Sequence, residues 1–301
     1  MLNPPLSLLS DDLLVSIVEH VAKLPDNDGD LYNLSLADRA FTQSCQKYIF
    51  RNLKFSSNGK ISTNLIKVKK ILDENPSFAN QVRMVELLIS REASWVFQDH
   101  TFISILQLLS KSLMPPHELH LGGHMYSFNP SFMFKDPIIV VQQLARSFFS
   151  QTLTILRLTQ CANVPLPLFL ICPRLREVFL NQVSAAEKFY DTFPDDQCSG
   201  REAPLLEYFD CRQSHNLVTQ MITPPPRFDT PVVIWSNLRV FKFNPRSRGN
   251  EGMACLQPIL DAACNTLEEL YLTDSNIGEC RCSIFSITRR ETDDFMNQLT
   301  T

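Results

Sequence analysis

Three clusters in the sequence contain residue types that bind metal ions or transfer protons. The run from His117 to His120 (H-E-L-H) is one residue short of the H-E-x-x-H spacing that places two imidazoles one helical turn apart on zinc. Residues 26–30 (D-N-D-G-D) are rich in calcium ligands, but glycine occupies the fourth position instead of the sixth, and Ala37 stands where a bidentate glutamate is required. Cys280 and Cys282 form a close pair with no second pair at zinc spacing. We therefore predict no metal site and no cofactor.

The sequence also lacks the common motifs of catalysis. It contains no G-x-S-x-G, no P-loop and no G-x-G-x-x-G, and paired acids such as Asp293 and Asp294 are typical of a solvated surface. His124 adds a third histidine near His117 and His120, but the latter two would point to opposite faces of a strand. The sequence therefore predicts a protein without catalytic residues. An enzyme whose site leaves no motif is an alternative.

The elements that could position functional side chains are indicated by an apolar pattern that occurs seven times. In each copy, which we call a frame, an apolar residue is followed three and five positions later by two more. Because side chains alternate along an extended chain, the last two residues of a frame share one face, and a short strand buries that face only when successive copies stack. The frames are Val82/Val85/Leu87, Pro116/Leu119/Leu121, Leu153/Leu156/Leu158, Leu175/Val178/Leu180, Leu206/Phe209/Cys211, Leu238/Phe241/Phe243 and Leu267/Leu270/Leu272.

Helical patterns lie between the frames. Apolar residues recur at helical spacing in 102–113, 138–148 and 253–263. Asp136 and Pro137 supply a capping side chain and a fixed φ just before the second of these segments. Strands that alternate with helices are typical of parallel sheets, because a parallel connection must cross back over the sheet. We therefore expect an α/β fold with parallel strands.

The first 55 residues follow a different pattern. Apolar residues from Leu13 to Val21 form a helical stripe, with Ser10 as the expected N-cap and two acidic residues in the first turn. More apolar residues follow at helical spacing between Leu31 and Phe50. Three short helices of this kind carry more apolar surface than about 50 residues can bury internally, so we expect a partner to cover the excess.

This N-terminal segment resembles the F-box, the helical module that attaches substrate receptors to Skp-type adaptors of cullin ubiquitin ligases. Residues 9–18 (L-S-D-D-L-L-V-S-I-V) resemble its opening L-P-x-E-L-L-x-x-I-L, and residues 34–41 resemble its second element. The chain departs from the family in having Ser10 in place of the proline, Phe41 in place of the usual tryptophan, and an insertion around 26–30.

The rest of the chain carries two further resemblances. Residues 71–83 look like the linker helix and first strand of many fungal F-box proteins, and the frames resemble the L-x-x-L-x-L strand segment of leucine-rich repeats. Together the resemblances imply an α/β fold in three parts. A three-helix F-box (1–55) and a linker helix (56–81) precede an irregular leucine-rich-repeat-like β/α solenoid with parallel strands (82–301).

The resemblance implies a non-catalytic, substrate-recruiting subunit of an SCF-type (Skp, cullin, F-box) ubiquitin ligase. The F-box would bind the Skp-type adaptor and, through it, the cullin core, while the repeat domain would bind an unknown target protein. The alternative is a repeat scaffold whose F-box-like head no longer docks to the ligase. The residues implied in adaptor binding are Leu9, Ser10, Leu13, Leu14, Ile17, Val18, Leu34, Leu36 and Phe41.

A target-binding surface follows from the alternation of side chains in the frames. If the last two residues of each frame are buried, their neighbours lie on the opposite, concave face. This face would combine aromatic rings with charged groups, the residue types that anchor protein interfaces. The predicted target-binding residues are Arg157, Phe179, Tyr208, Arg212, Lys242 and Tyr271.

Composition limits the partners and the compartment. The formal charge of −4 favours no nucleic-acid partner, and we interpret Lys67, Lys69, Lys70, Arg246 and Arg248 as solvated side chains. No charged-then-apolar leader is present and no apolar run approaches the roughly 20 residues that span a bilayer, so we expect no membrane partner. The nine cysteines lie mostly in apolar surroundings and should be free thiols. These features predict a cytoplasmic and/or nuclear protein.

Overall fold

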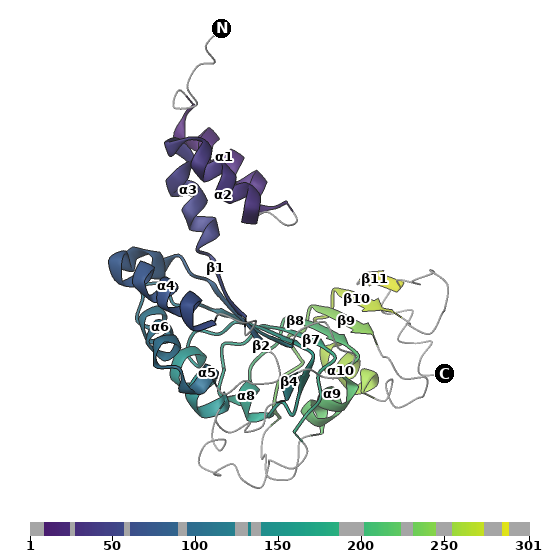
Figure 1. Ribbon diagram of the computed structural model, residues 1–301. Helices are drawn as coiled ribbons and strands as arrows, with labels where there is room; N and C mark the ends of the chain where they lie inside the picture. The colour runs from purple at the N-terminus through teal and green to yellow at the C-terminus, as the bar shows by residue number, and fades with distance from the viewer. Residues whose placement is uncertain are drawn as a thin grey trace, which may run out of the picture.

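The chain folds into a small helical head followed by a mixed α/β body (Figure 1). Among the residues that the structure describes, no helix is long and apolar enough to cross a membrane. This computed structural model describes residues 9–24, 28–56, 61–89, 95–123, 132–133, 140–186, 202–223, 231–244, 255–273 and 285–288.

The head consists of α1 (Asp11–Ala22), α2 (Asp28–Ala37) and α3 (Arg39–Ile49). Ser10 stands at the N-cap of α1, but its side chain makes no capping hydrogen bond, which corrects the expected capping role. The side chain of Asp38 does cap α3, because it accepts a hydrogen bond from the backbone nitrogen of Ala40. The three helices enclose a separate small core of Leu14, Val18, Leu31, Phe41 and Cys45.

A single parallel sheet forms the centre of the body. Its order is β1-β2-β3-β5-β7-β8-β9-β10-β11, and every neighbouring pair is parallel except the last, which is antiparallel. A second, two-stranded sheet pairs β4 (Phe132–Met133) with β6 (Cys161–Ala162). The main strands are β1 (Asn52–Ser56), β2 (Met84–Ile89), β3 (Glu118–Gly123), β5 (Ile155–Thr159), β7 (Glu177–Asn181), β8 (Tyr208–Arg212), β9 (Val240–Asn244), β10 (Glu269–Leu272) and β11 (Phe285–Thr288).

The strands align the frames in one register, as the sequence predicts. The middle residue of each frame pairs with the middle residue of the next, from Val85 to Leu270, and the last residues do the same from Leu87 to Leu272. All of these side chains are buried except Leu272, which is half-buried. Burying such a side chain contributes about 1.5–3 kcal/mol. The stacked apolar rows therefore fix the register, because a shift by one residue would move each row to the solvent face.

Helices cover one face of this sheet (Figure 1). Two of them differ from the sequence prediction. The segment expected as an α-helix over 138–148 is a π-helix in its described part, so Phe149 instead of Phe148 is fully buried. Leu113 is 88% exposed, because its helix ends at Ser110. The helical elements are α4 (Ile61–Glu74), η2 (Pro76–Asn80), α5 (Trp95–Gln98), α6 (His100–Ser110), η3 (Val140–Phe149), α8 (Pro167–Leu170), α9 (His215–Ile222) and α10 (Leu256–Ala263).

The boundary between head and body lies earlier than the sequence prediction placed it. Strand β1 pairs with β2, and its Leu53 and Phe55 belong to the core of the body, so the head ends before residue 52. The predicted linker is also part of the body, because Leu65 and Leu72 of α4 are buried in the same core. Only the short turn between α3 and β1 separates the two cores.

The turn between head and body is held by specific contacts. The backbone oxygen of Arg51 accepts hydrogen bonds from the backbone nitrogens of Arg83 and Met84, at 2.8 and 3.1 Å. Beside it, the rings of Phe50 and Phe78 stack with their centroids 4.3 Å apart. Such an offset aromatic pair adds about 1 kcal/mol beyond its buried area, so it stabilises the position of the head against the body.

Candidate protein-interaction surfaces

The face of the sheet opposite the helices carries the side chains that alternate with the buried rows. We call it the open strand face. It consists of the residues on β2 to β10 that alternate along each strand with the buried residues. Its central row runs across neighbouring strands through Arg157, Phe179, Asp210, Lys242 and Tyr271. The sequence prediction that these positions share one face is consistent with this register.

Five of the six predicted target-binding side chains touch one another in a continuous line. The guanidinium carbon of Arg157 lies 3.7 Å from the centroid of the Phe179 ring, and this ring lies 4.8 Å from that of Tyr208. The ammonium of Lys242 lies 5.4 Å from the Tyr208 centroid and 4.8 Å from that of Tyr271. Two cations and three rings therefore form one line of cation–π and ring–ring contacts across β5 to β10, which orders the long side chains before any partner arrives.

Arg212, the sixth predicted residue, lies beside this line. Its guanidinium donates to both carboxylate oxygens of Asp210, at 3.0 and 3.1 Å. The Asp210 side chain is 9% exposed, whereas that of Arg212 is 58% exposed. Arg212 thus covers a buried carboxylate and keeps much of its own surface available. A partner can contact the arginine, while the aspartate only orients it.

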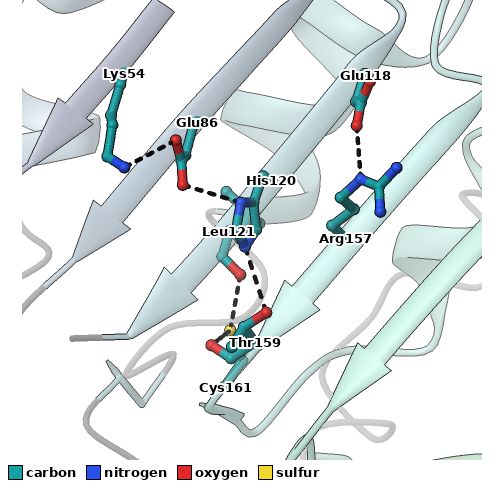
Figure 2. A network of polar contacts seen from close by, with 8 residues as sticks. All are labelled: Lys54, Glu86, Glu118, His120, Leu121, Arg157, Thr159 and Cys161. Atoms are coloured by element: carbon teal, nitrogen blue, oxygen red, sulfur yellow. Dashed lines mark hydrogen bonds and ion pairs between the residues drawn. The ribbon is translucent and has the colours of Figure 1, made fainter. Parts of the chain in front are cut away.

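The β1-to-β5 end of the open strand face holds a chain of polar contacts (Figure 2). Lys54 pairs with Glu86 at 3.3 Å, and the other oxygen of Glu86 accepts from His120 Nδ1 at 3.1 Å. The hydrogen bond from His120 lowers the pKa of Glu86, and the charge of Lys54 acts in the same direction, against the effect of burial. The far ring nitrogen of His120 lies 3.3 Å from the hydroxyl of Thr159.

A second ion pair runs beside this chain of contacts. Glu118 accepts a hydrogen bond from Arg157 Nε at 2.6 Å (Figure 2). Arg157 therefore links the acidic end of the face to the aromatic line. Within the described part of the chain, no group of three His, Cys, Asp or Glu side chains is arranged to hold a metal ion. His124, Cys280, Cys282 and the pair Asp293/Asp294 lie outside the described residues.

A ladder of glutamines at the ends of three strands was not predicted from the sequence. Gln160, Gln182 and Gln213 follow β5, β7 and β8, and each adopts a left-handed φ, of 54°, 57° and 54°. Their side-chain amides bond in series: Gln160 Nε2 donates to Gln182 Oε1 at 3.3 Å, and Gln182 Nε2 donates to Gln213 Oε1 at 3.0 Å. The signal in the sequence is a glutamine two residues after the last apolar position in three consecutive frames.

The described cysteines are core residues. Six of the chain's nine cysteines fall in the described ranges, all as free thiols, and five of these are buried. Burial raises the pKa of Cys161 to about 12, and burial raises that of Cys211 as well. Because the thiolate is the nucleophile, these two side chains are unreactive at neutral pH.

The head presents apolar side chains that its own core leaves uncovered. On α1, Leu13 and Ile17 are 53% and 38% exposed and stand one helical turn apart. Leu36 on α2 is 68% exposed. We call Leu13, Ile17 and Leu36 the head patch. Val15, Leu24 and Tyr32 of the head are exposed as well. Monomeric proteins do expose single apolar residues, but six on so small a unit are more than the head covers by itself, and a partner can cover some of them.

The nine residues implied in adaptor binding divide between the surface and the interior. Leu14, Val18 and Phe41 are buried in the head core. Their packing holds the helices that carry the exposed residues in place. The other six reach the surface at least in part: Leu9, Ser10, Leu13, Ile17, Leu34 and Leu36.

The head stands close to the open strand face. Glu19, Lys23 and Leu31 from the head line one cavity together with His120 and Arg157 from the sheet, and its volume is about 600 Å³.

No protein-family model matches the chain, and neither a curated protein nor a solved structure does.

Proposed function

We propose that the protein is a substrate-recruiting subunit of an SCF-type ubiquitin ligase. The head would dock to a Skp-type adaptor, and the body, a leucine-rich-repeat-like solenoid, would hold a target protein on the open strand face. The observation that carries this proposal is the head patch, because Leu13 and Ile17 fall in the segment that resembles the opening of the F-box.

The division of α1 into two faces supports adaptor docking. Leu14 and Val18 point into the head core, while Leu13 and Ile17, each one position earlier, remain exposed. Because neighbouring helical positions lie about 100° apart, Leu13 and Ile17 form an exposed apolar strip beside the buried one, and a partner that covers this strip removes it from water. An adaptor that receives an amphipathic helix in a groove would do so, with Leu13 and Ile17 as anchors at i and i+4.

The open strand face supports target binding by its composition. Tyrosine and arginine are enriched among the residues that dominate binding energy at interfaces, and Arg157, Tyr208 and Arg212 all lie on this face. Such a receptor needs no catalytic side chain. Its contribution is to raise the effective concentration of the target beside a ubiquitin-charged enzyme and to fix its orientation.

The test is direct binding of the purified protein to a Skp-type adaptor, measured by calorimetry. Wild type should bind, and Ile17→Asp should abolish binding, because an unpaired carboxylate would be buried at the interface at a cost of several kcal/mol. Ile66→Asp is the matched control, since Ile66 is 61% exposed on α4, outside the head. This control should bind like wild type.

Undiminished binding by a folded Ile17→Asp variant would exclude the head patch as the docking surface. If wild type itself binds no Skp-type adaptor, the F-box assignment fails and the scaffold alternative replaces it.

A further inference from the structure

The residues that immediately precede the strands form a continuous row across the sheet. Each accepts, through its backbone oxygen, a hydrogen bond from the backbone nitrogen of the next member, at 2.8 to 3.0 Å. Neighbouring members are therefore about 4.8 Å apart, the spacing of strands in a sheet. We call this the pre-strand row, and its members in order are Arg51, Arg83, His117, Thr154, Arg176, Glu207, Arg239 and Glu268.

In the second half of this row the charges are neutralised in neighbouring pairs. Arg176 bonds to Glu207 at 2.8 Å, and Arg239 bonds to Glu268 through two nitrogens at 2.9 Å. Opposite charges directly across a strand pair are stabilising, whereas like charges there are destabilising. The charged side chains of this half therefore already have counter-ions within the protein.

The first half of the row contains two arginines and a histidine and no acidic member. Arg51, Arg83 and His117 are consecutive members, and no ion pair within the described part of the chain involves any of them. The guanidinium of Arg83 instead contacts the backbone oxygen and the sulfur of Met114, at 3.3 and 3.1 Å. Lys47 adds a further positive charge from α3, one helical turn before Arg51.

Lys47, Arg51, Arg83 and His117 line a common cavity of about 500 Å³. No acidic side chain is among its lining residues. Asn80 and Gln81 contribute amide groups to the same wall, whereas the hydroxyl of Tyr48 is engaged by Glu19. Gln81 Oε1 is buried and has no hydrogen-bond partner, and a half-turn of that amide would present its NH₂ group at the same position. The cavity therefore offers several donors and a net positive charge.

Burial and nearby charges together shift the pKa of His117. Burial lowers the pKa of His117 first, and the nearby charges of Arg83 and Arg51 lower it further, while Glu118 on β3 opposes them. The carboxylate of Glu118 is engaged by Arg157. Nearby, Tyr48 is hydrogen-bonded to Glu19, so that carboxylate too is occupied.

We propose that this cavity binds a phosphate group. Arg51 and Arg83 can present planar donor forks from adjacent strands to a tetrahedral anion, Lys47 supplies further positive charge, and His117 can donate a ring N–H. A dianion fits the charge of the site better than a carboxylate, because one negative charge would leave most of these cations uncompensated. The site shares no residue with the head patch or with the aromatic line, although Arg51 and Tyr48 also line the cavity between the head and the open strand face.

The test is the melting temperature of the full chain with and without inorganic phosphate or pyrophosphate, at constant ionic strength set with chloride. Either anion at about 10 mM should raise the melting temperature of wild type, because a ligand that binds only the folded state stabilises it. The double variant Arg51→Gln/Arg83→Gln should lose this increase. Arg176→Gln/Arg239→Gln is the matched control, because it removes two arginines from the paired half of the same row, and it should keep the increase.

A second measurement separates binding from a purely structural role. The pKa of His117, followed by NMR, should rise when phosphate is added, because the anion favours the imidazolium against the repulsion of Arg51 and Arg83. In phosphate-free buffer the double variant should remain folded, since the removal of two like charges offsets the loss of the contacts between Arg83 and Met114. A phosphoserine peptide and its unphosphorylated form, compared with pyrophosphate, show whether the group is best presented on a protein or as a free anion.

The proposal is overturned if phosphate and pyrophosphate change neither the melting temperature of wild type nor the pKa of His117. It is also overturned if both double variants respond alike, since the response would then not belong to this half of the row.

Discussion

Two glutamates on the open strand face have pKa values that are shifted in opposite directions. Burial raises the pKa of Glu177, and the charges of Glu118 and Glu207 add to this effect while Arg157 opposes it. The pKa of Glu86 is lowered, chiefly by the hydrogen bond from His120. The sequence shows both residues as acids on a polar face, and only the neighbours contributed by adjacent strands distinguish them.

The two glutamates should therefore respond to substitution with opposite signs. A carboxylate whose pKa is raised in the folded state destabilises that state when ionised, so Glu177→Gln should increase the free energy of unfolding at pH 7. Glu86→Gln should decrease it, because a carboxylate with a lowered pKa stabilises the folded state above its ordinary pKa of about 4.3.

Urea denaturation of both variants and wild type at several pH values checks this prediction. The advantage of Glu177→Gln should shrink as the pH falls through the raised pKa of Glu177. The loss in Glu86→Gln should shrink as the pH falls below the ordinary value. A decrease in stability at pH 7 in both variants would contradict the opposite shifts.

Strands and their register were predictable because they depend on a repeated local pattern. Frames such as Leu153/Leu156/Leu158 are short, apolar and similar, so stacking is the arrangement that buries them all. Strand β1 was missed because residues 1–55 were assigned to the head, although Phe50, Leu53 and Phe55 have the spacing of a frame. Cys282, Phe285 and Ile287 have the same spacing at β11, beyond the seven frames that the prediction used. The π-helical geometry of η3 was also missed, since the α-helical and π-helical patterns differ only in which of Phe148 and Phe149 faces the core.

The glutamine ladder gives a prediction for these elements. Gln182→Ala and Gln182→Gly both remove the two ladder hydrogen bonds of Gln182, each worth about 1 kcal/mol. Alanine must also adopt the left-handed φ of 57°, whereas glycine does so without strain. Alanine should therefore be the less stable variant, by about 1 kcal/mol.

Thermal and chemical unfolding of the two variants measure this difference. The usual order at an ordinary β-strand or helix position is the reverse, with alanine the more stable residue. Finding that usual order at position 182 would show that the left-handed backbone at the strand end is absent.

For the whole molecule, the sequence indicated which residues share a surface but not how they interact. Alternation placed Arg157, Phe179 and Lys242 on one face, yet their ring and charge contacts depend on strands that lie far apart in the chain. The cluster of Arg51, Arg83 and His117 was missed for the same reason, because the three residues are separated by more than thirty positions and show no local charge run.

The two proposed surfaces should be separable by mutation. Replacing Phe179, Tyr208 and Tyr271 by alanine removes the aromatic line from the open strand face and leaves the head unchanged. Because these rings are half-buried, some loss of stability is expected, so the melting temperature of the triple variant must first show that it is folded at the assay temperature.

The most direct test of the account is affinity purification from the native cell, with quantitative mass spectrometry of wild type, Ile17→Asp and the folded triple-alanine variant. The account predicts that wild type recovers a Skp-type adaptor, a cullin and one or more targets. Ile17→Asp should lose the adaptor and cullin and keep the targets, while the triple variant should lose the targets and keep the adaptor. Recovery of neither adaptor nor cullin with wild type would contradict the central claim.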